Sequence, residues 1–199
     1  DPKGIEKMKI LIITPFFYPH IGGMERSLFN LAKGLAECHH DVTVYTTVFG
    51  GNPSVYPGFK VFRFPIPSLM DWALSIPSFV ENYSIPDFCI LGGIGKDIMS
   101  GLETTIKVLS RKNVMIALRI PTSDHIQRHI RDGLFPEILQ SIDYFVCIDK
   151  LAGAYLRNYV PEERIRYIPN GVDAFAFQSQ KKKKKRDNSV LYRGRISKR

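Results

Sequence analysis

Residues 9–14 read KILIIT, and residues 18–47 read YPHIGGMERSLFNLAKGLAECHHDVTVYTT. The first run is apolar without alternation, which is typical of a strand buried on both faces of a parallel sheet. Such a strand needs helices above and below the sheet. The second stretch predicts the first of these helices, because it carries one apolar stripe over three turns. The stripe consists of Met24, Leu28, Leu31, Ala32, Leu35 and Ala36.

The same alternation of strand and helix continues to residue 168. Strands are expected at 42–47, 61–64, 88–91, 114–120, 144–148 and 165–168, and helices at 68–83, 96–110, 123–140 and 150–159. Strands interleaved with helices predict an α/β fold with a doubly wound, Rossmann-like parallel sheet. Ligands of such sheets bind at the carboxyl ends of the strands.

Charge is unevenly distributed along the 199 residues. The net charge is +9, but six positive charges lie in residues 181–186, so the rest of the chain carries +3. We interpret this run as a solvated linker rather than a nucleic-acid or anionic-lipid patch, because it is not interleaved with aromatic residues. We expect a globular domain at 8–168, a linker at 169–188 and the first strand of a second domain within 189–199. Residues 1–7 are expected to be a non-native or disordered start.

The cysteine content and the hydropathy of the sequence indicate the cellular compartment of the protein. Cys38, Cys89 and Cys147 are odd in number and widely separated, so we expect buried thiols rather than disulfides or metal ligands. No apolar stretch reaches the roughly 20 residues that cross a bilayer, and no signal core opens the chain. The sequence therefore predicts a cytoplasmic protein, with contact to the inner face of the membrane left open.

Residues 50–77 are rich in proline, glycine and aromatic residues, and Trp72 lies among them. Exposed aromatic side chains here are candidates for binding a substrate or a lipid. Packing beneath a long loop is the favoured interpretation.

A pair of glycines, Gly22 and Gly23, lies between the first strand and the first helix. Glycines let the backbone approach a ligand closely, and a helix N-terminus favours an anion. The pair does not fit the dinucleotide pattern Gly-x-Gly-x-x-Gly. We predict that a phosphate group, most simply a diphosphate, binds here.

Three stretches together resemble a known family. The run at residues 18–47 is similar to the opening of family 4 glycosyltransferases, with Tyr-Pro, a Gly-Gly-x-Glu loop and a Leu-Ala-x-x-Leu helix in that order. Residues 164–177, RIRYIPNGVDAFAF, resemble the segment of that family that leads into the interdomain linker. Residues 190–199, VLYRGRISKR, look like the Gly-Arg start of its donor domain. The matches follow the family order along the chain.

The resemblance implies the N-terminal, acceptor-side half of a GT-B enzyme, which transfers a sugar from a nucleoside diphosphate with retention of configuration and without metal or cofactor. Gly22, Gly23 and Arg195 would bind the donor diphosphate, since a guanidinium makes bidentate contacts with phosphate. The acceptor would be a glycan, a lipid-linked molecule or a small molecule. Because the family's donor-side carboxylates are absent, we expect residues 1–199 alone to be inactive.

Two departures from the family pattern concern particular residues. The family opening continues with a Gly-His-x-Val turn, and the helix-ending glycine of that turn is replaced by His39, which must then tolerate a left-handed or turn conformation. The usual histidine after the fifth strand is replaced by Arg119, a candidate ligand of an anionic acceptor or of the departing phosphate. His125 is a candidate for contacting acceptor hydroxyls, although an exposed His125 behind a capping Ser123 is the favoured interpretation. Arg119 and His125 are also the candidates for a catalytic role, and no residue is assigned as the catalytic base. Further acceptor-side candidates are Tyr18, Thr122 and Ser123.

Other functions are kept as alternatives. A sugar-nucleotide epimerase or hydrolase is possible on the same scaffold. Outside catalysis, the chain would be a basic module that binds nucleic acid or a membrane surface. Asp149, at the start of a helix, is interpreted as an N-cap without a catalytic role.

Overall fold

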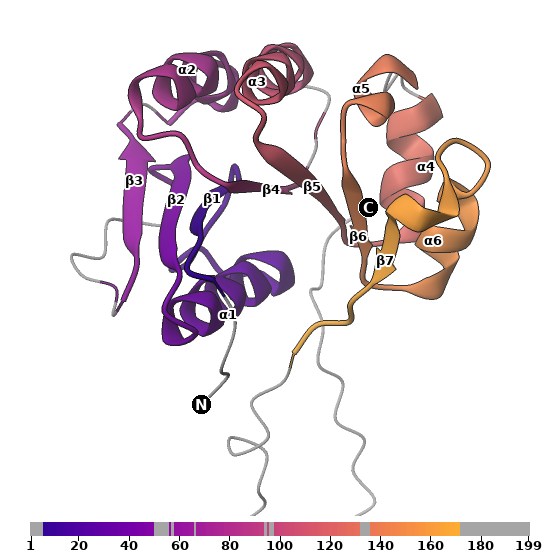
Figure 1. Ribbon diagram of the computed structural model, residues 1–199, viewed down its shortest axis with the longest axis horizontal. Coiled ribbons are helices and arrows are strands. Elements are labelled where there is room, and N and C mark those ends of the chain that lie inside the picture. Colours follow the sequence, from indigo (N-terminus) through magenta and orange to yellow (C-terminus); the bar gives the residue numbers. More distant parts are fainter. Residues whose placement is uncertain are drawn as a thin grey trace, which may run out of the picture.

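The protein is an α/β domain in the computed structural model, which describes residues 6–49, 56, 58–65, 67–93, 95, 98–131 and 136–171. Seven strands form one parallel sheet in the order β3-β2-β1-β4-β5-β6-β7 (Figure 1). The strands are β1 (Lys9–Ile13), β2 (Asp41–Thr47), β3 (Lys60–Phe64), β4 (Phe88–Gly92), β5 (Met115–Ile120), β6 (Tyr144–Cys147) and β7 (Ile165–Tyr167). The helices are α1 (Gly23–Glu37), α2 (Leu69–Asn82), α3 (Met99–Arg111), α4 (Ser123–Arg131), α5 (Pro136–Gln140) and α6 (Lys150–Leu156), with a short 3-10 turn at Glu162–Arg164.

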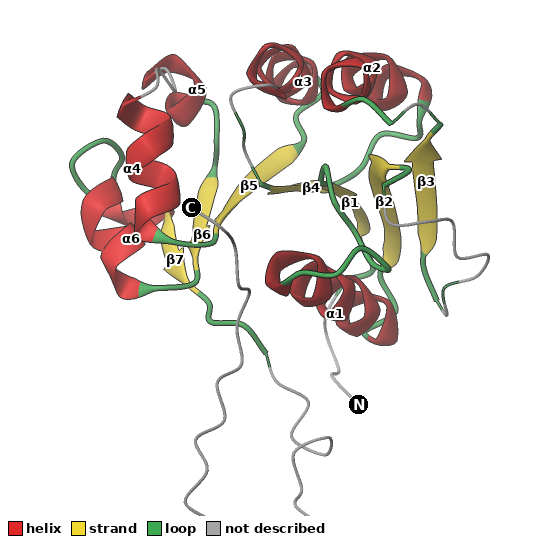
Figure 2. Ribbon diagram, turned by 180° about the vertical axis from the view of Figure 1, so that it is seen from behind, coloured by secondary structure: helices red, strands yellow, loops and turns green. Residues whose placement is uncertain are grey.

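Helices cover both faces of the sheet, as the apolar first run requires. Helix α1 lies on one face, and α2 and α3 lie side by side on the other (Figures 1 and 2). Within β1, Ile10 and Ile12 belong to the core under α1, whereas Leu11 and Ile13 belong to the core under α2 and α3. The doubly wound parallel sheet is therefore confirmed, and the lack of alternation in residues 9–14 reflects burial on both sides.

One expected helix is wrong. Residues 123–140 do not form a single helix, because α4 ends at Arg131 and α5 begins at Pro136. Proline has no amide hydrogen and its ring clashes with the preceding turn, so it is favoured at the first position of a helix rather than inside one. Pro77 lies inside α2 all the same, and that helix continues past it to Asn82.

Other expectations concern Trp72, the three cysteines and the C-terminal segment. Trp72 is buried on α2, so it belongs to the core and is not an exposed aromatic that could bind a ligand. Cys89 and Cys147 are buried thiols as predicted, but Cys38 is exposed at the end of α1. Burial raises the pKa of Cys147 to about 11. The expected strand at 189–192, the lysine tract and Arg195 all lie outside the described residues.

Candidate functional site

The strand order reverses between β1 and β4, which makes the carboxyl edge there the expected ligand site of a doubly wound sheet. The buried Thr14, directly after β1, joins the two strand ends. Its hydroxyl is 2.8 Å from the carbonyl oxygen of Gly92 and 3.0 Å from that of Phe16. The loop from residue 15 to Gly22 therefore begins at a fixed point and carries the glycine pair to the start of α1.

The two glycines have different surroundings. Gly22 has extended dihedral angles, φ −174° and ψ 167°, which any residue adopts. A β-carbon at Gly22 would collide with the carboxylate of Glu25, so any larger residue requires that carboxylate to move. A β-carbon at Gly23 would meet no atom within 4 Å. Only Gly23 therefore presents an open backbone at the N-terminus of α1, where an incoming anion is favoured.

A carboxylate and a histidine are paired at the same helix start. Glu25 is only 7% exposed, and its Oε1 lies 3.1 Å from Nδ1 of His20. The ring of His20 stacks on Phe16, with ring centroids 4.9 Å apart. Sequence reasoning assigned no role to His20 or Glu25. The available signal was the position of Glu25, three residues after the N-cap, where a glutamate turns back toward the helix start.

A cavity of about 1220 Å³ opens beside this loop. Both glycines and the His20–Glu25 pair line it. Two of its apolar side chains are exposed, Tyr18 by 45% and Ile21 by 89%. The backbone carbonyl of Tyr18 accepts hydrogen bonds from the Arg63 guanidinium at 2.6 Å and from the Tyr56 hydroxyl at 2.7 Å. Tyr18 thus lines the cavity beside the glycine pair, and its acceptor-side role stays a prediction.

Arg119 lies near the end of β5 and is only 6% exposed. Its Nη2 donates to Oγ of Ser27 in α1 at 2.6 Å and to Oδ1 of Asn170 at 2.5 Å. Its Nη1 is buried and has no hydrogen-bond partner among the described residues. Burial lowers the pKa of Arg119. Both partners of Nη2 are neutral, and none of the ion pairs in the described part of the chain involves Arg119.

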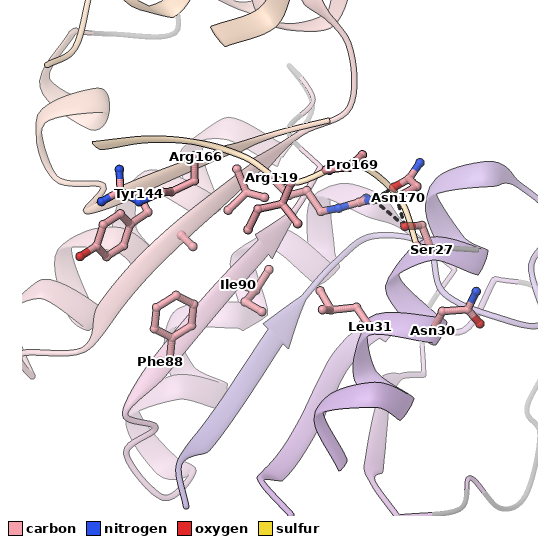
Figure 3. A pocket seen from close by; sticks show the side chains of 14 residues that line it. Ser27, Asn30, Leu31, Phe88, Ile90, Arg119, Tyr144, Arg166, Pro169 and Asn170 are labelled. Atoms are coloured by element: carbon pink, nitrogen blue, oxygen red, sulfur yellow. Dashed lines mark hydrogen bonds between the residues drawn. The ribbon is translucent and has the colours of Figure 1, made fainter. Parts of the chain in front are cut away.

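A second cavity, of about 690 Å³, extends from Arg119 along the α1 side of the sheet (Figure 3). Alternate residues of neighbouring strands form its apolar floor, among them Phe88, Ile90, Ala117 and Val146. It contains two cationic side chains, Arg119 and Arg166, and no aspartate or glutamate is among its described lining residues. Arg166 is exposed and lies over the ring of Tyr144, 5.1 Å from its centroid.

The remaining candidates lie where β5 passes into α4. Thr122, not Ser123, caps α4, because its Oγ1 accepts from the backbone amide of His125 at 3.2 Å. His125 is partly buried rather than exposed, and its Nε2 lies 3.2 Å from Nε2 of His129. Burial, the neighbouring His129 and Arg128 lower the pKa of His125 to about 4. His125 is therefore neutral at physiological pH and brings no charge to the site.

Asp149 confirms its expected capping role and also links two helices. Its Oδ1 accepts from the amide of Ala152 in α6 at 2.6 Å. Its Oδ2 accepts from the amide of Ser123, the first residue of α4, at 3.2 Å. The acceptor-side candidate Ser123 is thus held through its backbone, and its role toward a ligand stays a prediction.

The structure brings part of the predicted set together. Gly23 and Ser27 are four residues apart in α1 and lie on the same side of that helix, and Arg119 binds Ser27. In the described part of the chain, no group of three or more His, Cys, Asp or Glu side chains is arranged to hold a metal ion. None of the helices described there is long and apolar enough to span a membrane.

Two relatives match the chain in sequence. It is 32% identical over 62 residues to a phosphatidylinositol N-acetylglucosaminyltransferase subunit of Arabidopsis thaliana, and 32% identical over 60 residues to the Homo sapiens protein of the same name. The matched stretches cover 30% and 29% of this chain but only 14% and 12% of the relatives. No family model matches the chain. The similarity supports a glycosyltransferase relationship for this domain.

Solved structures give weaker matches. An alpha-glucosyltransferase in complex with UDP and a 13-mer DNA matches 80% of this chain and 40% of its own length, with 9% identity and a TM-score of 0.49. A DNA/pantothenate metabolism flavoprotein from Streptococcus pneumoniae matches 73% of this chain and 82% of its own length, with 14% identity and a TM-score of 0.44. The fold assignment does not depend on either, because the seven-stranded parallel sheet establishes it.

Proposed function

We propose that this chain is the acceptor-side domain of a GT-B glycosyltransferase that transfers a sugar from a nucleoside diphosphate to an acceptor, with retention of configuration. One observation carries the proposal. Gly23, which has open space around its backbone, is the first residue of α1 and lies at the point where the strand order of the sheet reverses, the expected ligand site. The sequence similarity to two glycosyltransferase proteins supports the same reaction class.

In this proposal, the domain stabilises the leaving diphosphate. Negative charge accumulates on that group as the bond to the sugar breaks, and preorganised donors lower the barrier for such a step. The first amides of α1 supply partial positive charge. Arg119 adds a full positive charge, because it donates to Ser27, which lies four residues after Gly23 on the same side of α1. Arg195 is proposed as a further phosphate ligand from outside the described residues.

The acceptor side is proposed more broadly. Both relatives are named for phosphatidylinositol, so a lipid-linked acceptor at the membrane surface is one class to test. Glycans and small molecules are the others. A reaction without a metal ion, located in the cytoplasm, remains a prediction from the sequence.

The test uses the full-length protein and a panel of nucleoside diphosphate sugars, with release of the nucleoside diphosphate as the readout. Release that requires an acceptor identifies transfer, whereas release without one identifies hydrolysis. Gly23→Val is expected to abolish transfer and weaken donor binding, because its side chain fills the open approach to α1. Gly34→Val is the matched control, since Gly34 is also in α1 with open space around it but lies in its last turns. Unchanged turnover of Gly23→Val would contradict the proposal.

A further inference from the structure

Arg119 is a buried cation without a counterion in the described part of the chain. Removing a charge from water is costly unless an opposite charge or a full set of hydrogen bonds compensates it. The two neutral oxygens of Ser27 and Asn170 satisfy only Nη2, and Nη1 has no partner among the described residues. The guanidinium is always protonated at physiological pH, so none of the described residues compensates its charge.

We infer that Arg119 and Ser27 form a binding site for a phosphate group of a substrate. A guanidinium has two parallel N–H groups that match two phosphate oxygens, and such charge-assisted bonds are stronger than bonds to neutral oxygens. The hydroxyl of Ser27 supplies a third polar contact on the α1 side. This inference rests on the proposed function for the identity of the substrate, but not for the presence of the anion.

The surroundings of Arg119 fit an anion better than a cation. The 690 Å³ cavity beside it has no carboxylate among its described lining residues, and its other arginine, Arg166, is exposed and already stacked on Tyr144. Asn170 is exposed, and its side-chain oxygen lies against Nη2, where a phosphate oxygen is expected to replace it (Figure 3). We expect the Asn170 side chain to turn away when the anion enters.

Two substrates could supply the phosphate. One is the diphosphate of the donor, bound at the N-terminus of α1. The other is an acceptor that itself bears a phosphate group. Both present the same chemistry to Arg119, and kinetics distinguish them: a change at Arg119 raises KM for the donor in the first case and for the acceptor in the second.

The binding test uses pyrophosphate and inorganic phosphate as probes with the full-length protein, at constant ionic strength set with chloride. Calorimetry measures affinity, and the melting temperature is recorded with each probe. Arg119→Met is expected to weaken pyrophosphate binding at least tenfold. Arg166→Met is the matched control, because Arg166 lines the same cavity but is exposed and stacked on Tyr144. It is expected to change the affinity less than twofold.

A second pair of variants covers the case in which Arg119→Met fails to fold. Ser27→Asp places a carboxylate beside the guanidinium and neutralises it, so pyrophosphate binding is expected to disappear while the fold is retained. Ser27→Asn has nearly the same size without the charge and is expected to retain more affinity than Ser27→Asp.

Three results would overturn the inference: no phosphate binding by the unaltered protein, equal binding by Ser27→Asp and Ser27→Asn, or unchanged pyrophosphate affinity in a folded Arg119→Met variant. Failure of the proposed function looks different. A protein that transfers no sugar but binds pyrophosphate through Arg119 contradicts the transferase assignment and leaves the phosphate site in place.

Discussion

The carboxylate of Glu25 occupies the space beside Gly22 that a β-carbon would need, and this contact separates the roles of two adjacent glycines. A side chain at Gly22 would displace the Glu25 carboxylate, whereas a side chain at Gly23 would meet open space. In Gly22→Ala the carboxylate must move away from His20, so we expect a loss of about 1–2 kcal/mol in the free energy of unfolding. Urea denaturation measures it.

Gly23→Ala is the control for that variant. Alanine fits the open space and lowers the entropy of the unfolded chain, so the expected change is a gain of about 0.5–1 kcal/mol. Equal effects of Gly22→Ala and Gly23→Ala on stability would contradict the assignment of different roles.

His39 confirms the conformation that its place in the family pattern predicts. It follows α1 with φ 67°, in the left-handed region where a side chain is strained. His39→Gly is therefore expected to raise the free energy of unfolding by about 0.5–1 kcal/mol. Asn113→Gly is the comparison, because Asn113 has φ 54° but asparagine tolerates this region well. A larger gain at Asn113 than at His39 would contradict this explanation.

The fold was predictable because its signals are local. The apolar run at 9–14 and the stripe on the first helix specify a buried strand and an amphipathic helix within a few turns of chain, and seven of the expected strands are present. The exception at 123–140 is also local, since Pro136 marks the start of a new helix. The boundary between this domain and the expected linker stays a prediction.

The candidate site was only partly predictable. The glycine pair is a local signal, but the contacts of Arg119 are not: Ser27 is 92 residues away in sequence and Asn170 is 51 away. Arginine in a strand gives no sign of whether a carboxylate will face it in the fold. Only the folded arrangement of α1, β5 and the segment after β7 shows that no carboxylate of the described residues pairs with Arg119.

Close packing of α2 on α3 gives a prediction about stability alone. The backbone carbonyl of Ala73 lies against Gly101, where a β-carbon would collide with it. Gly101→Ala is expected to force the helices apart and to lower the free energy of unfolding by about 2–4 kcal/mol. Gly34→Ala, at an open position of α1, is expected to stabilise the protein by about 0.5–1 kcal/mol. Thermal and urea unfolding of both variants test the difference.

The lowered pKa of His125 predicts a pH dependence of stability. Its pKa is about 4 in the folded protein, against 6.5 for a free histidine. Between these values the unfolded chain binds a proton that the folded protein does not, so stability falls as the pH is lowered from 6.5 to 4 and is constant above that window. After allowance for its contact with solvent, the expected loss is about 1–2 kcal/mol.

His125→Phe keeps a ring in this place and removes the titrating group. The free energy of unfolding of the unaltered protein, minus that of this variant, is therefore expected to rise as the pH increases from 4 to 6.5. His39→Asn is the control, since His39 is exposed and asparagine keeps its backbone conformation. Urea denaturation at several pH values gives the curves for all three proteins. If His125→Phe leaves the acid side of the curve unchanged, the loss of stability arises from other groups and burial of a neutral His125 is not its cause.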